Sequence, residues 1–203
     1  MLITNIHREL DTVLDLLIKE EQIVGIFQNE SEWGPRALGN RSILFDPRNP
    51  KAKQIVNIVK KREAYRPFAC TVMLEHAEEY FDMLQLPESP WMSFAIQCKP
   101  KALKDIPSLV HADNTCRIQT VTEEQNPNYY NLIKGFYERT GVPIIFNTSF
   151  NLGGEAIVET VYDAIDTCNR SMINHLYIPE DQDVYIPWAV SYTHLTLPTI
   201  LLV

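Results

Sequence analysis

The sequence predicts an α/β domain with a mixed, partly parallel sheet, because apolar strands and amphipathic helices alternate along the chain. Short apolar runs such as residues 23–27 and 142–146 are typical of buried strands. Polar segments rich in Gly, Arg or Asn follow both of these runs. Ligands of open α/β sheets bind at the ends of strands, so these two segments are the first candidates for a site.

The first half of the chain predicts two helices and two strands. Residues 8–20 place Leu10, Val13, Leu14 and Leu17 at helical spacing. A strand over residues 23–27 then runs into a polar loop. The dipeptide Asn49-Pro50 predicts a helix start that continues to Lys60, with Asn as the cap and Pro at the first helical position. Arg66-Pro67 breaks this helix, and residues 68–74 form the next strand.

The second half repeats the alternation of helix and strand. Residues 93–98 and 116–121 predict two strands, and Asn126-Pro127 predicts another helix start. Gly141 fits the C′ position of that helix. The strand over residues 142–146 then leads into the loop 147–155. A helix capped by Thr160 and a short strand over residues 175–178 complete the predicted domain, which spans residues 1–186.

Residues 187–203 break this pattern, because they carry no charge and no amphipathic period. A hydrophobic edge strand is one reading of this segment. We favour a non-native tail, since the run SYTHLTLPT resembles translated adapter sequence.

The composition limits the classes of function. A net charge of -8 argues against nonspecific nucleic-acid binding and against anionic membranes as partners. We find no apolar run near the roughly 18 residues of a membrane helix, and the N-terminus does not resemble a secretory signal. The sequence predicts a cytoplasmic protein with reduced thiols and no protein-held metal, because its Cys and His residues are scattered: Cys70, Cys98, Cys116, Cys168, His7, His76, His111, His175 and His194.

Cations gather in short segments of this acidic chain, and each segment lies beside predicted turns. Residues 34–42 (GPRALGNRS) and 60–69 (KKREAYRPFA) carry six of the 18 Lys and Arg residues, and residues 147–155 (NTSFNLGGE) add glycines and hydroxyl and amide side chains. Guanidinium groups bind two phosphate oxygens at once, and Gly-rich turns let backbone N–H groups approach an anion. The pattern therefore predicts a phosphate-handling site.

These segments, together with residues 111–121 (HADNTCRIQTV), resemble the C-terminal domain of NodU/CmcH-type O-carbamoyltransferases over roughly residues 20–180. Lys60-x-Arg62 and Ser149-x-Asn151 also resemble the K-x-R and S-x-N pair of the YrdC-like nucleotide-binding fold. The resemblance implies a twisted open α/β sheet with an electropositive cavity.

The resemblance also implies a reaction. Such a domain uses ATP, with Mg²⁺, and carbamoyl phosphate to make carbamoyl adenylate. A separate N-terminal domain, which we expect to be absent here, then transfers the carbamoyl group to a hydroxyl of a small molecule or sugar. The identity of that acceptor stays open.

The resemblance and the residue types together assign roles. We expect Lys60 and Arg62 on the ATP phosphates, and Ser149 and Asn151 on the phosphates or ribose. Arg36 and Arg41 fit as clamps on carbamoyl phosphate or on the β- and γ-phosphates of ATP. The second group of expected binding residues is Arg66, Arg117 and Asn147.

Several alternatives remain open at this point. Arg36 could instead pair with a carboxylate such as Glu32, and Arg66 could be an ordinary surface residue. His111 and Asp113 suggest a general base, but a structural hydrogen bond is the simpler reading. A threonylcarbamoyl-adenylate synthase, which would use threonine and bicarbonate, shares the K-x-R and S-x-N core. An inactive fragment that keeps the fold is the other alternative.

Overall fold

The computed structural model describes residues 5–179, so the predicted tail at 187–203 lies outside the described residues. An open sheet of eight strands runs through the domain in the order β1-β8-β2-β3-β7-β4-β6-β5. Its centre, from β2 to β4, is antiparallel, whereas β1, β8 and β2 are parallel, as are β4 and β6. The mixed α/β prediction is confirmed. The strands are β1 Asn5–His7, β2 Val24–Phe27, β3 Arg41–Phe45, β4 Ala69–Met73, β5 Ala95–Gln97, β6 Thr115–Val121, β7 Ile144–Ser149 and β8 His175–Tyr177.

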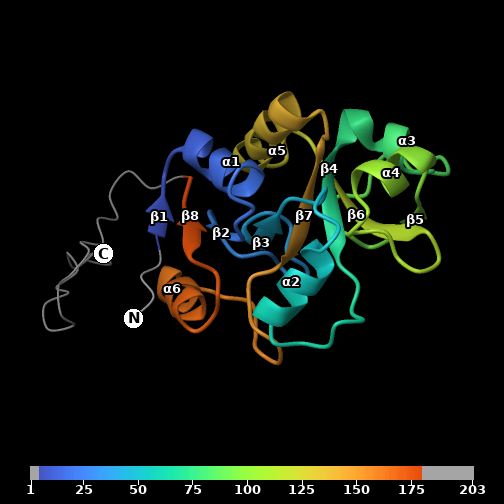
Figure 1. Ribbon diagram of the computed structural model, residues 1–203. Helices are drawn as coiled ribbons and strands as arrows, with labels where there is room; N and C mark the ends of the chain where they lie inside the picture. The colour runs from blue at the N-terminus through green and yellow to red at the C-terminus, as the bar shows by residue number, and fades with distance from the viewer. Residues whose placement is uncertain (1–4, 180–203) are drawn as a thin grey trace, which may run out of the picture.

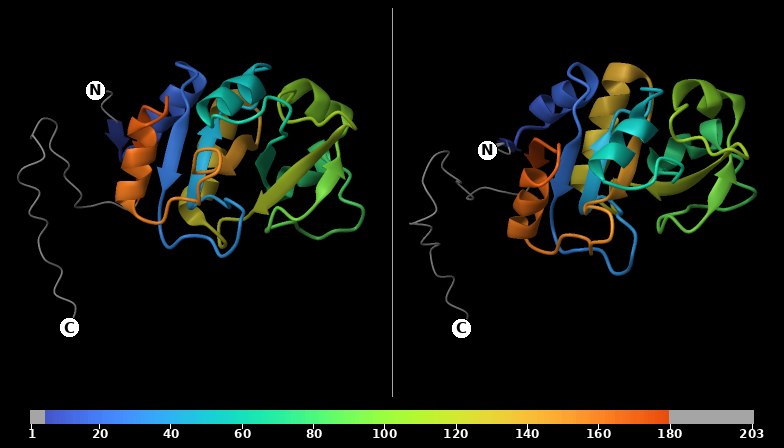
Figure 2. Two further views of the ribbon diagram at one scale, coloured as in Figure 1. Left: turned by 90° about the horizontal axis from the view of Figure 1, so that it is seen from below. Right: turned by 60° about the horizontal axis from the view of Figure 1, so that its bottom comes forward.

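Helices cover both faces of the sheet. Helices α1 and α5 pack side by side on one face, and α2 and α6 lie on the other (Figures 1 and 2). Helices α3 and α4 lie at the end of the sheet formed by β5 (Figure 1). The helices are α1 Leu10–Ile18, α2 Ala52–Val59, α3 Ala77–Tyr80, α4 Pro100–Asp105, α5 Pro127–Thr140 and α6 Val161–Asn169, with a short 3-10 turn, η1 Leu74–His76.

Helix α5 begins and ends where its sequence predicts. The Asn126 side chain accepts a hydrogen bond from the Tyr129 N–H at 3.2 Å, and Pro127 occupies the first turn. Gly141 ends the helix with a left-handed φ of 75°. Before α2, the Asn49 side chain accepts from the Lys51 N–H at 2.8 Å, although regular α-helix starts only at Ala52.

Two predicted loops are in part strands. Strand β3, over Arg41–Phe45, was not predicted, because its polar first residues read as part of the Gly-rich loop. Strand β7 continues through Asn147 to Ser149, three residues beyond its predicted end. Both segments are paired to neighbouring strands, since Ser42 lies opposite Ser149 in the sheet. Strand β1 and helices α3 and α4 were not predicted either.

The core lies between the sheet and its two helical layers. Its largest buried side chains are aromatic, including Tyr80, Tyr129 and Phe146. All four cysteines are buried. No helix among the described residues is long and apolar enough to cross a membrane.

Candidate functional site

A cavity of about 210 Å³ opens at one end of the sheet, where β4 and β6 begin and β7 ends. The pairing of the strands places three lining residues side by side, because Ala69 on β4 lies opposite Arg117 on β6 and opposite Asn147 on β7. Side chains at one register position point to the same face of a sheet. The small side chain of Ala69 therefore leaves open space between Arg117 and Asn147.

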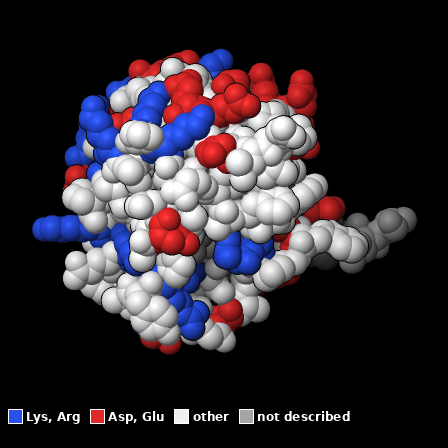
Figure 3. All heavy atoms as spheres, turned by 90° about the vertical axis from the view of Figure 1, so that its right-hand side faces the viewer, with Lys and Arg blue, Asp and Glu red and all other residues white. Residues whose placement is uncertain are grey.

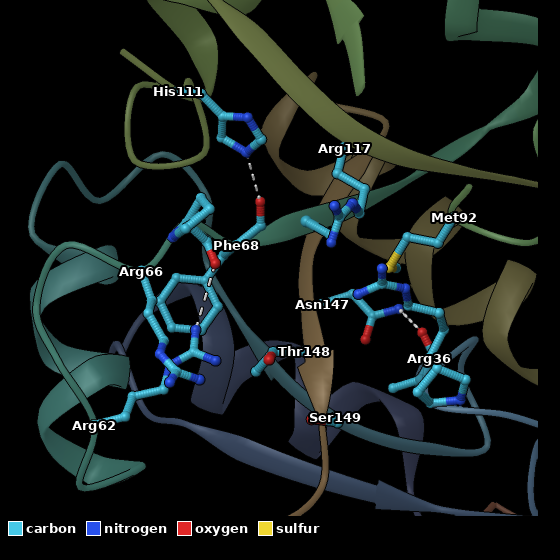
Figure 4. A pocket seen from close by; sticks show the side chains of 14 residues that line it. Arg36, Arg62, Arg66, Phe68, Met92, His111, Arg117, Asn147, Thr148 and Ser149 are labelled. Atoms are coloured by element: carbon cyan, nitrogen blue, oxygen red, sulfur yellow. Dashed lines mark hydrogen bonds between the residues drawn. The ribbon is translucent and has the colours of Figure 1, made fainter. Parts of the chain in front are cut away.

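Four arginines line this cavity, and we call it the arginine cavity: Arg36, Arg62, Arg66 and Arg117. They come from separate parts of the chain: the loop after β2, the segment between α2 and β4, and strand β6. Arg62 and Arg66 face Arg36 across β7, and Arg117 approaches from β6 (Figure 4). No Asp or Glu is among the described residues that line the cavity.

Two of these cations lack a partner. Among residues 5–179, the guanidinium groups of Arg36 and Arg117 make no hydrogen bond or ion pair, and the Nε atom of Arg117 is buried. Burial, followed by the positive charge of Arg117, lowers the pKa of Arg36. Two like charges that face each other without a counter-ion favour binding of an anion.

Arg62 is held more firmly than the others. Its Nε donates to Asn57 Oδ1 at 2.6 Å, and its guanidinium carbon lies 4.2 Å from the centre of the Phe68 ring. Burial, then the neighbouring Arg66, lowers the pKa of Arg62 to about 10. Arg66 lines the cavity and forms an exposed ion pair with Glu63 at 2.8 Å, and such a pair adds little to stability.

Lys60 contacts the S-x-N pair, of which Ser149 lines the cavity. Its ammonium donates to the backbone oxygen and the hydroxyl of Ser149, and to Asn151 Oδ1 at 2.8 Å. The side chain is 2% exposed. Burial, then the charge of Arg62, lowers the pKa of Lys60 to about 7 despite the three oxygen acceptors. Lys60 therefore joins the end of α2 to the end of β7.

Arg41 lies apart from the arginine cavity. Its guanidinium donates to the backbone oxygens of Gln28, Asn29, Asn40 and Glu159, and it stacks 3.6 Å from the centre of the Phe27 ring. These contacts tie together the loops that follow β2 and β7, which leave the same end of the sheet (Figure 2).

Glu32 occupies the backbone N–H groups that the Gly-rich loop was expected to offer to a ligand. Its Oε1 atom accepts from the N–H groups of Leu38, Asn40 and Arg41 at 2.7, 2.8 and 3.1 Å. The alternative pairing of Glu32 with Arg36 is not observed. Arg36 of this loop lines the cavity. The Glu32 carboxylate of the same loop accepts the hydrogen bonds of the backbone N–H groups.

Asn147 lines the arginine cavity, and hydrogen bonds hold its side-chain amide in one orientation. Its Nδ2 donates to the Ala37 backbone oxygen at 3.1 Å and to Thr71 Oγ1 at 3.0 Å, which fixes the orientation of the amide. Gln119, oriented by its own bond to the Leu38 backbone oxygen, accepts from Thr71. Asn147 Oδ1 is buried without a partner among the described residues. Sequence reasoning placed Asn147 in the site but missed the supporting pair on β4 and β6.

A second cavity of about 360 Å³ adjoins the first and shares Pro35 and Ser149 with it. Asn151 lines this cavity together with Glu32, Glu155 and Glu159. Across the described part of the chain, no group of three or more His, Cys, Asp or Glu side chains could hold a metal ion.

Solved structures share the fold of this domain. Full-length HypF, in a phosphate- and nucleotide-bound form, superposes with a TM-score of 0.56 at 20% identity, over 80% of this chain and 20% of HypF. P. abyssi Sua5, in complex with L-threonine, superposes with a TM-score of 0.56 at 13% identity, over 87% of this chain and 49% of Sua5. The YrdC-like fold expected from the K-x-R and S-x-N pair is confirmed.

Curated relatives are much closer in sequence. The nodulation protein NolO of Bradyrhizobium diazoefficiens is 45% identical over 150 residues, which cover 71% of this chain and 27% of NolO. A 3'-hydroxymethylcephem-O-carbamoyltransferase of Amycolatopsis lactamdurans is 30% identical over 77% of this chain and 29% of its own length. This chain thus spans about a quarter of these relatives. The profile of one family, described as carbamoyltransferase C-terminus, matches residues 16–182, and the chain belongs to that family.

Proposed function

We propose that this domain uses ATP to convert carbamoyl phosphate to carbamoyl adenylate, the first half-reaction of an O-carbamoyltransferase. One observation carries the proposal: four arginines surround a cavity that is also lined by Asn147, whose buried acceptor, Oδ1, has no partner among the described residues. The arginines favour a ligand with a phosphate group. The unpaired acceptor favours a ligand with an N–H donor close to that phosphate.

Carbamoyl phosphate carries both groups within one small molecule. Its phosphate would lie against Arg36 and Arg117, and its amide N–H would reach Asn147 Oδ1. Acetyl phosphate, which has a methyl group in place of the amide, would leave that oxygen unsatisfied. A buried acceptor without a partner costs about 1–3 kcal/mol, so the amide group contributes directly to selectivity.

The chemistry requires two displacements that balance. Water cleaves carbamoyl phosphate to carbamate and phosphate. A carbamate oxygen then attacks the α-phosphorus of ATP, the bond to the β-phosphate oxygen breaks, and pyrophosphate leaves. Negative charge builds up on the leaving groups in both steps. The domain contributes positioning and cationic stabilisation, and no protein nucleophile is needed.

The remaining residues have places in this scheme. Arg62 and Arg66 would contact the ATP phosphates on the side of the cavity opposite Arg36. Lys60 would act with Ser149 and Asn151 at the junction of the two cavities, where the nucleotide would extend toward the ribose. Arg41 would position the loops and not touch substrate. Mg²⁺, if it enters with ATP, would be held by phosphates and water.

The relatives support the wider context. HypF has been solved with phosphate and nucleotide, and one relative carries the name of an O-carbamoyltransferase. Since this chain spans about a quarter of such relatives, we propose that acceptor binding and carbamoyl transfer belong to a separate N-terminal domain. The cysteines are buried and widely spaced in the sequence, which fits a reducing compartment, and we place the protein in the cytoplasm.

Pyrophosphate release by the purified chain tests the proposal. With ATP and Mg²⁺, release should require carbamoyl phosphate and should fall at least a hundredfold in the Arg62→Ala variant. Release supported by threonine and bicarbonate would instead identify a threonylcarbamoyl-adenylate synthase. If ATP binds but no donor supports release, the isolated domain is not a carbamoyl-adenylate synthase.

A further inference from the structure

His111 lies on the wall of the arginine cavity, in the turn that precedes β6. Its Nε2 atom is 3.1 Å from the backbone oxygen of Phe68, and its Nδ1 atom is 3.1 Å from Thr115 Oγ1. Figure 4 shows the ring at the edge of the cavity, with its bond to the Phe68 carbonyl group. Both ring nitrogens therefore have a polar neighbour, and those neighbours determine where the protons lie.

The first ring proton follows from Phe68. A backbone carbonyl oxygen can only accept a hydrogen bond, so the Nε2 atom of His111 must carry a proton.

The second ring proton follows from Asp113 and Thr115. Asp113 Oδ1 lies 2.7 Å from Thr115 Oγ1 and 3.0 Å from the Thr115 backbone N. The bonds from Thr115 lower the pKa of Asp113, which is therefore ionised and can only accept. Two oxygens at 2.7 Å need a proton between them, so the Thr115 hydroxyl donates to Asp113. The hydroxyl can then only accept from His111, and Nδ1 must carry a proton as well.

We propose that His111 is an imidazolium, held in that state by Asp113 through Thr115, and that it is the fifth cation of the anion site. The inference rests on the proposed function in one respect, namely that the arginine cavity takes a phosphate group. His111 would add charge to that group and would also fix the carbonyl of Phe68, whose ring supports Arg62.

The charges around His111 make the negative charge of Asp113, which acts through Thr115, decisive for the second ring proton. The other charged groups that face the cavity would all oppose a proton on the ring, and Asp113 alone among the charged groups named here favours it. A bound anion would also favour the proton, and by linkage the proton would favour the anion to the same extent. The opposing groups are Arg36, Arg62, Arg66 and Arg117.

The affinity for an anion should therefore fall when a rise in pH removes the second ring proton of His111. Lys60 adds a pH dependence of its own, because its pKa is about 7. A single pH profile cannot separate the two groups, and a variant without the imidazole is needed. Sulfate is the appropriate probe, because it keeps its charge where phosphate monoesters titrate.

The experiment is an NMR titration of the full chain with sulfate between about pH 5.5 and 8.5. Sulfate should bind the wild type roughly tenfold more weakly at the upper limit than at the lower. The His111→Gln variant keeps an amide donor for the Phe68 carbonyl. At every pH it should bind sulfate about as weakly as the wild type does at the upper limit, and any pH dependence that remains should come from Lys60. Ring ¹⁵N shifts should show both nitrogens of His111 protonated at neutral pH.

Two further variants lie outside the lining of the cavity. Asp113→Asn and Thr115→Val should move the pH midpoint downward and leave the affinity at low pH unchanged. A purely structural role for His111 would instead weaken sulfate binding by one factor at all pH values.

Parallel profiles for the wild type and His111→Gln, or a ring with a single proton at neutral pH, would overturn the inference and leave the anion site intact. Failure of the wild type to bind sulfate at any pH would count against the anion site itself, and the ring shifts would still decide the protonation of His111.

Discussion

Unpaired positive charge, within the described part of the chain, distinguishes Arg36 and Arg117 from a paired arginine such as Arg139. Arg139 is bonded to Asp11 and Asp15 at the surface, whereas Arg36 and Arg117 face each other with no carboxylate among the residues that line the cavity. Like charges that are partly desolvated cost free energy in the unliganded protein. An anion that enters the cavity offsets the repulsion between the two arginines. The unpaired charges therefore favour binding of an anion.

Replacement of Arg117 by Met should separate binding from stability. Removal of an unpaired charge should leave the free energy of unfolding unchanged or raise it by up to about 1 kcal/mol, while sulfate affinity falls at least tenfold. Denaturant unfolding and sulfate titration measure the two effects. Arg139→Met is the matched control, and it should lose about 0.5 kcal/mol and keep its affinity. A large loss of stability in Arg117→Met would show that this arginine is structural.

Lys60 predicts a pH dependence of stability. Its pKa is about 7 in the fold and 10.5 as the ordinary value, so the unfolded chain holds the proton more tightly. The free energy of unfolding should therefore rise as the pH increases from about 7 to 10, and this gain is absent below about 7. Denaturant unfolding of the wild type and Lys60→Met at several pH values measures it. Equal slopes in the two proteins would contradict this assignment.

Individual site residues were predicted with different success from the sequence. Residue type and spacing indicated the arginines, and the structure brings Arg36, Arg62, Arg66 and Arg117 to one cavity. The sequence could not distinguish Arg41, because its contacts are backbone oxygens from distant segments. It also could not show that Glu32 occupies the loop N–H groups, since this depends on the path of the loop.

At the scale of elements, the sequence predicted helices best where capping residues and apolar periodicity indicate the same helix. Helices α5 and α6 have their predicted caps, and Thr160 forms a full capping box with Asp163. Strand β3 and the end of β7 were missed because polar side chains there bond across the sheet, and pairing partners are not visible in a single sequence. The cavity depends on that pairing, since Asn147 lies in β7.

The loop before β3 depends on close packing at Gly39. Its φ is +111°, and a Cβ atom at this position would lie 2.2 Å from the Tyr129 ring. Gly34 has a φ of +109° with open space around it, so it is a matched control. Gly39→Ala should lower the free energy of unfolding by about 2 kcal/mol more than Gly34→Ala, as denaturant unfolding would measure. Equal losses would mean that the contact with Tyr129 does not hold the loop.

At the scale of the whole molecule, the charge is unevenly distributed. The net charge is -8, yet the arginine cavity is lined by four cations. The face that includes α3, α4 and β5 shows acidic side chains along one edge and cations in other regions (Figure 3). An acidic protein repels anions in general, so any anion that stabilises this protein must bind at a particular site.

Pyrophosphate should therefore stabilise the chain against heat. A ligand at a hundred times its dissociation constant adds about 2.7 kcal/mol to the free energy of unfolding. We expect a rise of several degrees in the melting temperature of the wild type, and almost none in the Arg36→Gln, Arg117→Gln double variant. A similar rise in both proteins would place the binding outside the arginine cavity.

The most direct measurement compares the affinity of the chain for two stable ligands. Phosphonoacetamide mimics carbamoyl phosphate, and acetonylphosphonate differs from it by a methyl group in place of the amide nitrogen. Calorimetric titration should show that the wild type binds phosphonoacetamide at least tenfold more tightly, because only that ligand donates to Asn147 Oδ1. Asn147→Leu should abolish the preference while still binding both ligands. Equal affinities in the wild type would contradict the assignment of the cavity to carbamoyl phosphate.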